Sequence, residues 1–200
     1  SYIKFLFSIQ NSKNGELRIK AIPEVLDYFS KEIELKKETL YNCKMVQAQD
    51  GVSVESDTLG ALLYPLEGDT FALDMVIKPE RYHEFGIALH VDKELETGYF
   101  LRMNPKNQLV AWDMWPRGEQ GRYQWQIKGD VPYQIETARK LPKAEEYRVH
   151  IIKEKDICVV YINDEIVLST RMYNHKDGYA GIYVVQGNVK LIQYKEKRSE

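Results

Sequence analysis

Residues 70–91 decide the fold, and the two ends of this stretch read TFALDMVI (Thr70–Ile77) and FGIALHV (Phe85–Val91). In both runs every second side chain is apolar, so the apolar side chains fall on one face of an extended backbone. This pattern is typical of strands that bury one face in a core and turn a more polar face outward. We therefore predict a β-strand at each end of the stretch.

The same alternation continues outward at a spacing of roughly 8–12 residues, which is typical of β-sandwiches. Toward the N-terminus, Tyr2–Ile9 and residues 17–21 read as two strands, and Asn14-Gly15 between them favours a hairpin because both residues tolerate positive φ. Only Pro23–Lys37 carries a weak helical pattern. The sequence therefore predicts an all-β fold, a two-sheet antiparallel β-sandwich. The further predicted strands are Tyr99–Met103, Leu109–Trp115, Tyr147–Ile152, Ile157–Ile162, Ile166–Met172, Tyr179–Val185 and Val189–Tyr194.

Composition excludes several classes of protein. The chain has 200 residues, 44% of them hydrophobic, which suits one globular domain with a sizeable core. A formal charge of -2 argues against a nucleic-acid-binding protein, and no apolar run approaches the roughly 20 residues of a membrane helix. Cys43 and Cys158 are too few for a disulfide scaffold or a four-cysteine zinc site, and we expect both to be buried or partly buried thiols.

A long connection over Trp115–Pro142 interrupts the strand rhythm and is rich in proline, glycine and aromatic residues. Connections of this length are often functional, although a wide loop between poorly patterned strands explains them equally well. Aromatic faces and polar groups together suit a sugar or a partner domain, and packing of the aromatics in the core is the alternative. Alternation places Trp112 and Met114 on one face of their strand and Asp113 and Trp115 on the other, so one tryptophan should fill the core while the other is available to solvent, a partner domain or a ligand. The candidate sugar-binding or domain-docking residues are Trp112, Asp113, Trp115, Arg117, Arg122, Tyr123 and Trp125.

Three blocks of the chain resemble the non-catalytic C-terminal region of glycoside hydrolase family 32, the invertase, levanase and fructanase group. They are Leu17–Phe29 (LRIKAIPEVLDYF), Gly98–Arg117 (GYFLRMNPKNQLVAWDMWPR) and Val159–Tyr173 (VVYINDEIVLSTRMY), the last followed by Gly181-Ile182-Tyr183. The resemblance implies a lectin-like, concanavalin A-like jelly roll over residues 41–200. It also implies that residues 1–40 are the end of a catalytic region and a linker whose strands pack on the sandwich.

The catalytic motifs of that family are absent from this sequence. Family 32 places its carboxylates in Trp-Met-Asn-Asp-Pro-Asn, Arg-Asp-Pro and Glu-Cys motifs on a five-bladed propeller. Here Asn163-Asp164 is followed by Glu165 instead of proline, and neither Cys43 nor Cys158 follows a glutamate. We therefore expect no enzyme activity from this chain on its own.

No metal or cofactor site stands out in the sequence. The histidines at positions 83, 90, 150 and 175 show no ligand spacing, and His90 and His150 fall on the polar faces of their strands, so we expect surface histidines. Asp50, Asp57, Asp74 and Asp177 could contribute oxygen ligands to a calcium ion at the rim of the sheets, but no run of alternating acids marks a calcium loop. The sequence predicts neither a bound metal nor a cofactor.

Two functions follow as hypotheses. The preferred one is a structural module that stabilises or orients a family-32-like catalytic propeller acting on sucrose or fructan, because three blocks resemble that family while its catalytic motifs are absent. A chain that opens inside a strand also reads as a piece of a longer protein, and a complete protein that lacks only its Met is the alternative. The alternative is an independent carbohydrate-binding module that contacts fructan or sucrose through its aromatic cluster. The propeller of the same parent chain and an oligosaccharide are therefore the expected partners, and nucleic acid and membrane are not. The location in the cell stays open, with the cytoplasm slightly favoured over secretion.

Overall fold

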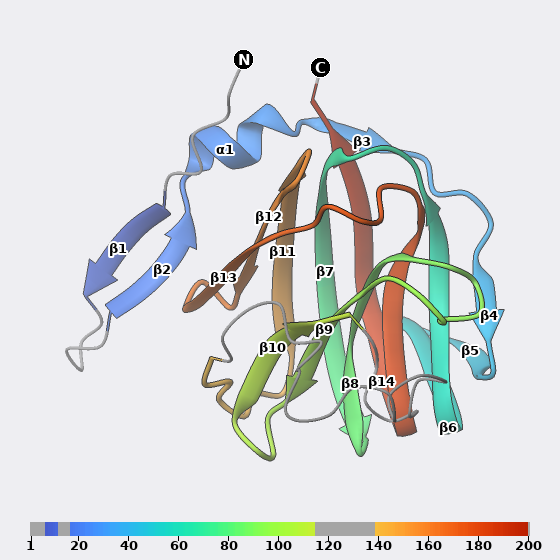
Figure 1. The fold of residues 1–200 in the computed structure, drawn as a ribbon. Coiled ribbons are helices and arrows are strands. Elements are labelled where there is room, and N and C mark those ends of the chain that lie inside the picture. The colour runs from blue at the N-terminus through green and yellow to red at the C-terminus, as the bar shows by residue number, and fades with distance from the viewer. Residues whose placement is uncertain (1–6, 12–16, 115–138, 200) are drawn as a thin grey trace, which may run out of the picture.

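The computed structural model describes residues 7–11, 17–114 and 139–199, and strands make up most of them (Figure 1). The short helix α1 (Pro23–Tyr28) begins at a proline, whose fixed φ suits the first helical position. At six residues α1 cannot cross a membrane, and the described part of the chain holds no helix that could. The strands are β1 (Phe7–Asn11), β2 (Leu17–Ala21), β3 (Lys31–Ile33), β4 (Thr39–Tyr41), β5 (Lys44–Ala48), β6 (Gly51–Leu66), β7 (Thr70–Arg81), β8 (Glu84–Val91), β9 (Tyr99–Asn104), β10 (Leu109–Asp113), β11 (Tyr147–Glu154), β12 (Ile157–Ile162), β13 (Ile166–Arg171) and β14 (Gly178–Arg198).

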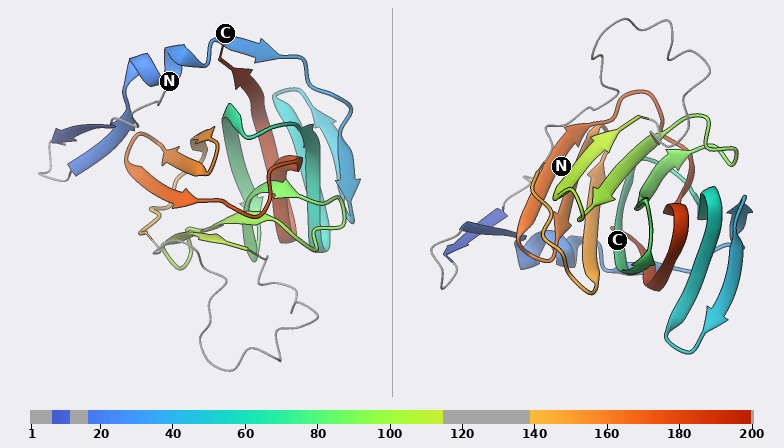
Figure 2. Two further views of the ribbon diagram at one scale, coloured as in Figure 1. Left: turned by 45° about the horizontal axis from the view of Figure 1, so that its top comes forward. Right: turned by 90° about the horizontal axis from the view of Figure 1, so that it is seen from below.

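These strands form a two-layer antiparallel β-sandwich, which confirms the predicted fold class (Figure 2). The first layer has the order β10-β9-β8-β14-β6, and the second has the order β14-β7-β11-β12-β13. Because β14 belongs to both layers, hydrogen bonds join β3–β14 into a single sheet of 12 strands.

Strand β14 passes from one layer to the other by bending at a bulge. Tyr179–Val185 pairs with β8, whereas residues 188–197 pair with β7, and the register shifts between Val185 and Gly187. A Cβ atom at Gly187 would lie 1.9 Å from the main-chain oxygen of Arg81, so only glycine fits at this bend. The bulge therefore sets the angle at which the two layers meet.

The main core fills the space between the layers. The apolar faces predicted for residues 70–77 and 85–89 both point into it, which confirms that part of the prediction, whereas Val91, predicted on the same face, packs in the outer cluster because the register shifts at His90. Its largest fully buried side chains include those of Trp112, Phe71, Phe85 and Tyr147.

The outer face of the second layer is covered by the N-terminal segment. Ala21, Val25 and Phe29 pack there against Ile152 and Val159 in a second apolar cluster. Strand β3 extends the sheet by pairing with the end of β14, and Figure 1 shows α1 and β3 running along this end of the sandwich. Strands β1 and β2 pair as the predicted hairpin, although its Asn14-Gly15 turn lies outside the described residues.

Residues 39–66 form three strands that the sequence pattern did not predict. Strand β6 is 16 residues long, and its residues 59–63 are buried one after another. Side chains on both faces of the strand are covered there, so the sequence shows no alternation. The predicted boundary between residues 40 and 41 stays a prediction.

Candidate functional site

The outer face of the first layer carries a group of charged and polar side chains, which we call the Glu84 cluster. It consists of Glu84 on β8, Arg102 on β9, Asp113 on β10 and Tyr183 on β14. Along each strand these residues alternate with side chains of the main core, such as that of Ile87 on β8. Because successive side chains point to opposite faces, all four point away from the main core. The strand order β10-β9-β8-β14 brings these four side chains together.

The carboxylate of Glu84 accepts most of the hydrogen bonds within the cluster. Its Oε1 accepts hydrogen bonds from Arg102 Nε at 3.1 Å and from the Tyr183 hydroxyl at 3.1 Å. Its Oε2 accepts from an Arg102 terminal nitrogen at 2.5 Å, which completes a two-point carboxylate–guanidinium pair. The Asp113 Oδ2 lies 3.6 Å from the other terminal nitrogen of Arg102, so one guanidinium contacts both carboxylates.

Burial makes these contacts stronger than surface ion pairs. The side chains of Glu84 and Asp113 are 7% and 1% exposed, whereas that of Arg102 keeps 15%. Burial and the nearby Glu84 carboxylate raise the pKa of Tyr183 well above its ordinary value, so its phenol stays protonated. Burial works against the charge of Arg102, but its hydrogen bonds to Glu84 still raise the pKa of Arg102.

Buried apolar side chains surround the cluster. Ala88, Leu63 and Phe100 belong to the same outer cluster as Tyr183, whose ring meets that of Phe100 edge-on at 5.8 Å. Gly86 lets the β8 backbone approach its neighbours closely, since a Cβ there would lie 1.9 Å from the main-chain oxygen of Leu101 and 2.8 Å from the Tyr183 Cε1. The cluster therefore brings a few polar groups together among closely packed apolar side chains.

The chemistry of the Glu84 cluster suits binding, and the described residues contain no group of histidine, cysteine and acidic side chains able to hold a metal. Carboxylate oxygens can accept hydrogen bonds from neutral hydroxyls, while the guanidinium can donate to ligand oxygens. The cluster can therefore recognise a polyhydroxylated ligand by hydrogen bonds.

Only two of the seven candidate residues named from the sequence lie in the described part of the chain. Trp112 is fully buried in the main core, as alternation predicted for one tryptophan of its strand, so its ring offers no surface to a ligand. Asp113 joins the Glu84 cluster. The remaining candidates lie outside the described residues: Trp115, Arg117, Arg122, Tyr123 and Trp125.

Sequence reasoning missed Glu84, Arg102 and Tyr183. Each is a polar or charged residue inside or beside an otherwise apolar strand. A polar group placed so close to apolar neighbours in the sequence could have indicated a candidate site. The cross-strand register that brings Gly86 opposite Arg102 and Tyr183 is not readable from single strands.

The prediction of a surface histidine at position 90 is wrong. His90 is 1% exposed, and its backbone has the unusual φ of 51°. Burial, and then the charge of Lys153, lower the pKa of His90 to about 3, so the ring is neutral at physiological pH. The other histidine predicted on a polar face, His150, is partly exposed and lies 2.6 Å from Asp74.

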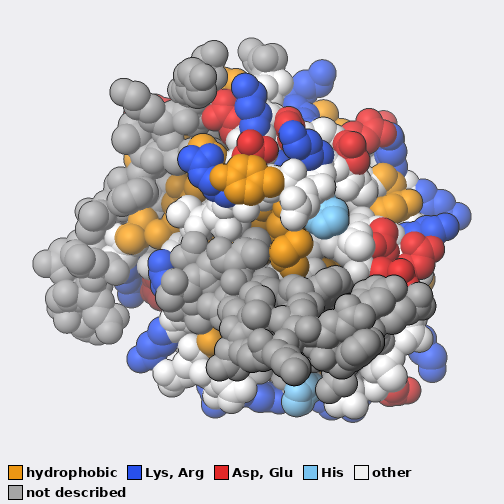
Figure 3. Space-filling view, viewed as in Figure 1, with side chains coloured by type: hydrophobic (Ala, Val, Ile, Leu, Met, Phe, Trp, Pro, Cys, Tyr) orange, Lys and Arg blue, Asp and Glu red, His pale blue; other side chains and the backbone are white. Residues whose placement is uncertain are grey.

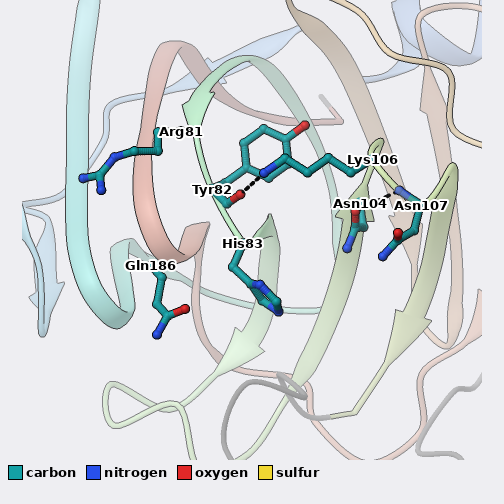
Figure 4. Close-up of a pocket in the computed structure, with 7 residues that line it drawn as sticks. All are labelled: Arg81, Tyr82, His83, Asn104, Lys106, Asn107 and Gln186. Carbon is teal, nitrogen blue, oxygen red and sulfur yellow. Dashed lines mark hydrogen bonds between the residues drawn. The ribbon is translucent and has the colours of Figure 1, made fainter.

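A second polar region lies at the end of the sandwich, in a pocket of about 410 Å³ that we call the end pocket (Figure 4). It is formed by the turn after β7, the turn between β9 and β10, and the bulge of β14. Lys106 Nζ donates a 2.5 Å hydrogen bond to the main-chain oxygen of Tyr82 and lies 4.4 Å from the centroid of the Tyr82 ring. The pocket is lined by Arg81, Tyr82, His83, Asn104, Lys106, Asn107 and Gln186.

Comparison of the sequence with known proteins finds no match, either to a family or to a curated protein. Solved structures do match. The carbohydrate-binding module CBM66 from Bacillus subtilis is 17% identical, with a TM-score of 0.67, and the match covers 82% of this chain and 97% of that module.

Two larger proteins match almost the whole of this chain over about a third of their own length. Sucrose-6-phosphate hydrolase from Lactobacillus gasseri is 11% identical with a TM-score of 0.54, covering 97% of this chain and 33% of that one. Exo-inulinase from Aspergillus awamori is 12% identical with a TM-score of 0.56, and the match covers 97% of this chain and 34% of the exo-inulinase chain. At these identities the likeness shows a shared fold, the β-sandwich found both in that binding module and within these two larger chains.

Proposed function

We propose that this chain is the non-catalytic β-sandwich module of a family-32-like glycoside hydrolase, working beside a catalytic β-propeller in the hydrolysis of sucrose or fructan. The observation that carries the proposal is the extent of the structural match. About a third of each larger enzyme covers 97% of this chain, whereas the free-standing CBM66 covers 82%. More of this chain is therefore accounted for by a part of a larger enzyme than by an isolated binding module.

The packing of the N-terminal segment supports this proposal. Val25 and Phe29 of this segment are buried against the second layer, and Arg18 forms a 3.0 Å ion pair with Glu165. The segment is thus part of the folded unit, as expected for a region that links the sandwich to a preceding domain. The absence of the three family-32 acidic motifs from the sequence supports a non-catalytic role.

Hydrolysis assays test the proposal directly. The purified chain should release no reducing sugar from sucrose, inulin or levan, and clear hydrolysis by this chain would refute the non-catalytic role. The coding sequence upstream should encode the acidic motifs of the propeller. An upstream sequence of a different kind would remove the proposed partner.

The Glu84 cluster favours a second candidate function, sugar binding by the module itself. It brings carboxylate acceptors and a guanidinium donor together beside apolar side chains, a combination suited to the hydroxyls and C–H faces of a sugar. Arg102 keeps the largest exposed fraction of the three charged side chains, so it would meet the ligand first. The aromatic residues Trp115, Tyr123 and Trp125 keep their proposed role in sugar contact or domain docking.

Calorimetric titration with sucrose, inulin and levan oligosaccharides separates the two candidates. Glu84→Gln keeps the shape of the side chain and removes one charge of the cluster, so it should weaken sugar binding at least about tenfold. Glu146→Gln is the matched control, because Glu146 pairs with Arg148 at an exposed position away from the cluster. Absence of binding to every sugar would leave only the structural role.

A further inference from the structure

The end pocket lies apart from the Glu84 cluster and has a different chemistry. None of its seven lining residues is acidic, and amide or cationic side chains make up most of the lining. Arg81 contributes little, because its guanidinium pairs with Glu55 at 3.0 Å and points away from the other lining residues in Figure 4. The charge that faces the pocket is therefore mainly that of Lys106.

Lys106 is held in place without being neutralised. Its ammonium is fixed by the main-chain oxygen of Tyr82 and by the ring of the same residue. No carboxylate among the described residues forms an ion pair with it, so the full positive charge is available to a ligand. A cation held against a ring and a carbonyl loses little side-chain freedom on binding, which favours affinity.

Hydrogen-bond donors surround this charge. Asn104 is buried to 8% exposure, and its Oδ1 accepts from the main-chain nitrogen of Asn107 at 3.2 Å. That bond fixes the orientation of the amide, and its Nδ2 group, which has no hydrogen-bond partner among the described residues, can donate to a ligand. His83 and Gln186 line the pocket with side chains that also carry donors. Gln186 has a φ of 48° at the β14 bulge, which fixes the backbone at this wall of the pocket.

The one aromatic ring of the lining is not open for sugar stacking. The Lys106 ammonium covers one face of the Tyr82 ring, and the ring packs edge-on against Phe85 at 4.9 Å. A neutral sugar would thus find neither an open aromatic face nor a carboxylate acceptor among these residues. An oxyanion would find a fixed cation and several donors.

We propose that the end pocket binds a small oxyanion, a carboxylate or phosphate group, with Lys106 as its charge partner and Asn104 as a hydrogen-bond donor. The group could be carried by a sugar acid or by a sugar phosphate, which share this chemistry. This inference does not depend on the proposed function, because none of its residues belongs to the Glu84 cluster.

Titration of the full chain with glucuronate, glucose 6-phosphate and inorganic phosphate tests the proposal, with glucose as the neutral probe. We expect saturable binding of at least one oxyanion below about 10 mM, weakened by added salt, and none of glucose. Preference for glucuronate would identify a carboxylate site, and preference for either phosphate compound a phosphate site. Absence of binding by all three anions, or equally tight binding of glucose, would overturn the proposal.

Variants locate the binding at this pocket. Lys106→Met should weaken oxyanion binding at least about tenfold, because it removes the charge and keeps an apolar stem over Tyr82. Gln186→Glu, which adds a negative charge at an exposed position of the wall, should have a similar effect. Lys176→Met, a matched change at an exposed lysine outside the pocket, should leave binding unchanged. Equal binding by the Lys106 and Lys176 variants would refute the site.

Discussion

Acidification should destabilise this sandwich through one buried histidine. His90 lies beneath the surface next to Phe71, with ring centroids 5.6 Å apart, and is 1% exposed. Burial is the main cause that lowers the pKa of His90 to about 3, and the charges of Lys153 and His175 act in the same direction, while Asp177 opposes them. The folded protein therefore holds this ring neutral at pH values where an exposed histidine is charged.

The sign and size of the effect follow from the two pKa values. In the unfolded chain the pKa of histidine is about 6.5, so the unfolded state binds a proton first as the pH falls. The stability contributed by the neutral ring is complete above about pH 6.5 and is lost progressively as the pH falls toward 3. At pH 5 the loss from this residue is about 2 kcal/mol, a figure that hardly changes if the folded pKa is one unit higher.

Urea unfolding at pH 7 and pH 5 measures this loss. His90→Asn removes the titrating ring and suits the backbone, because asparagine tolerates the φ of 51° at this position. Between pH 7 and pH 5 the free energy of unfolding of the variant should fall by about 2 kcal/mol less than that of the wild type. His83→Asn, a change at an exposed histidine that is not among the groups acting on His90, is the control and should lose as much stability as the wild type. Equal losses in the wild type and the His90 variant would refute the reasoning.

Three further substitutions test the packing of the cluster and of the buried charges. Arg102→Met leaves Glu84 buried without its guanidinium and should lower the free energy of unfolding by about 3–5 kcal/mol in urea titrations; a loss below about 1 kcal/mol would show that the pair is solvated. Gly86→Ala places a Cβ 1.9 Å from the main-chain oxygen of Leu101, so the free energy of unfolding should fall by about 3 kcal/mol or the variant should fail to fold. A melting temperature equal to that of the wild type would show that the backbones at Gly86 and Leu101 do not lie this close. Lys153 is fully buried, and because burial lowers the pKa of Lys153, the stability of the wild type relative to Lys153→Met should rise as the pH increases toward the ordinary lysine range; at pH 7 Lys153→Met should be at least as stable as the wild type, and a large loss would show that the main-chain hydrogen bonds of Lys153 outweigh the burial of its charge.

Much of the fold was predictable because the face of each layer that meets the main core is buried more completely than its outer face. Alternation in β7, β11 and β13 follows directly from that difference, and it places the core residues correctly. Alternation disappears where both faces are covered. Residues 59–63 of β6 are buried without interruption, between the main core and the outer cluster that contains Tyr183, so periodicity could not identify the strand.

The candidate site was less predictable because it depends on pairing between strands. Glu84, Arg102 and Asp113 are 11 to 29 residues apart in sequence, and only the order and register of β8, β9 and β10 bring them together. Alternation also misplaced His90. A bulge at this residue, which has a φ of 51°, shifts the register between β8 and β14, so its ring lies against Phe71 of the main core while Val91 packs in the outer cluster. A bulge reverses which side chains face the core beyond it, and the pattern of a single strand does not reveal it.

The shared strand β14 has a consequence for biosynthesis. It is the last strand of the described chain, yet one edge each of β6, β7 and β8 is completed only by it. While the ribosome is still making residues 178–198, these earlier strands expose unpaired edges that can join the edges of neighbouring nascent chains. Truncation before β14 should therefore yield aggregates instead of a smaller sandwich, and chaperones that shield open strand edges should matter most during translation of the last segment.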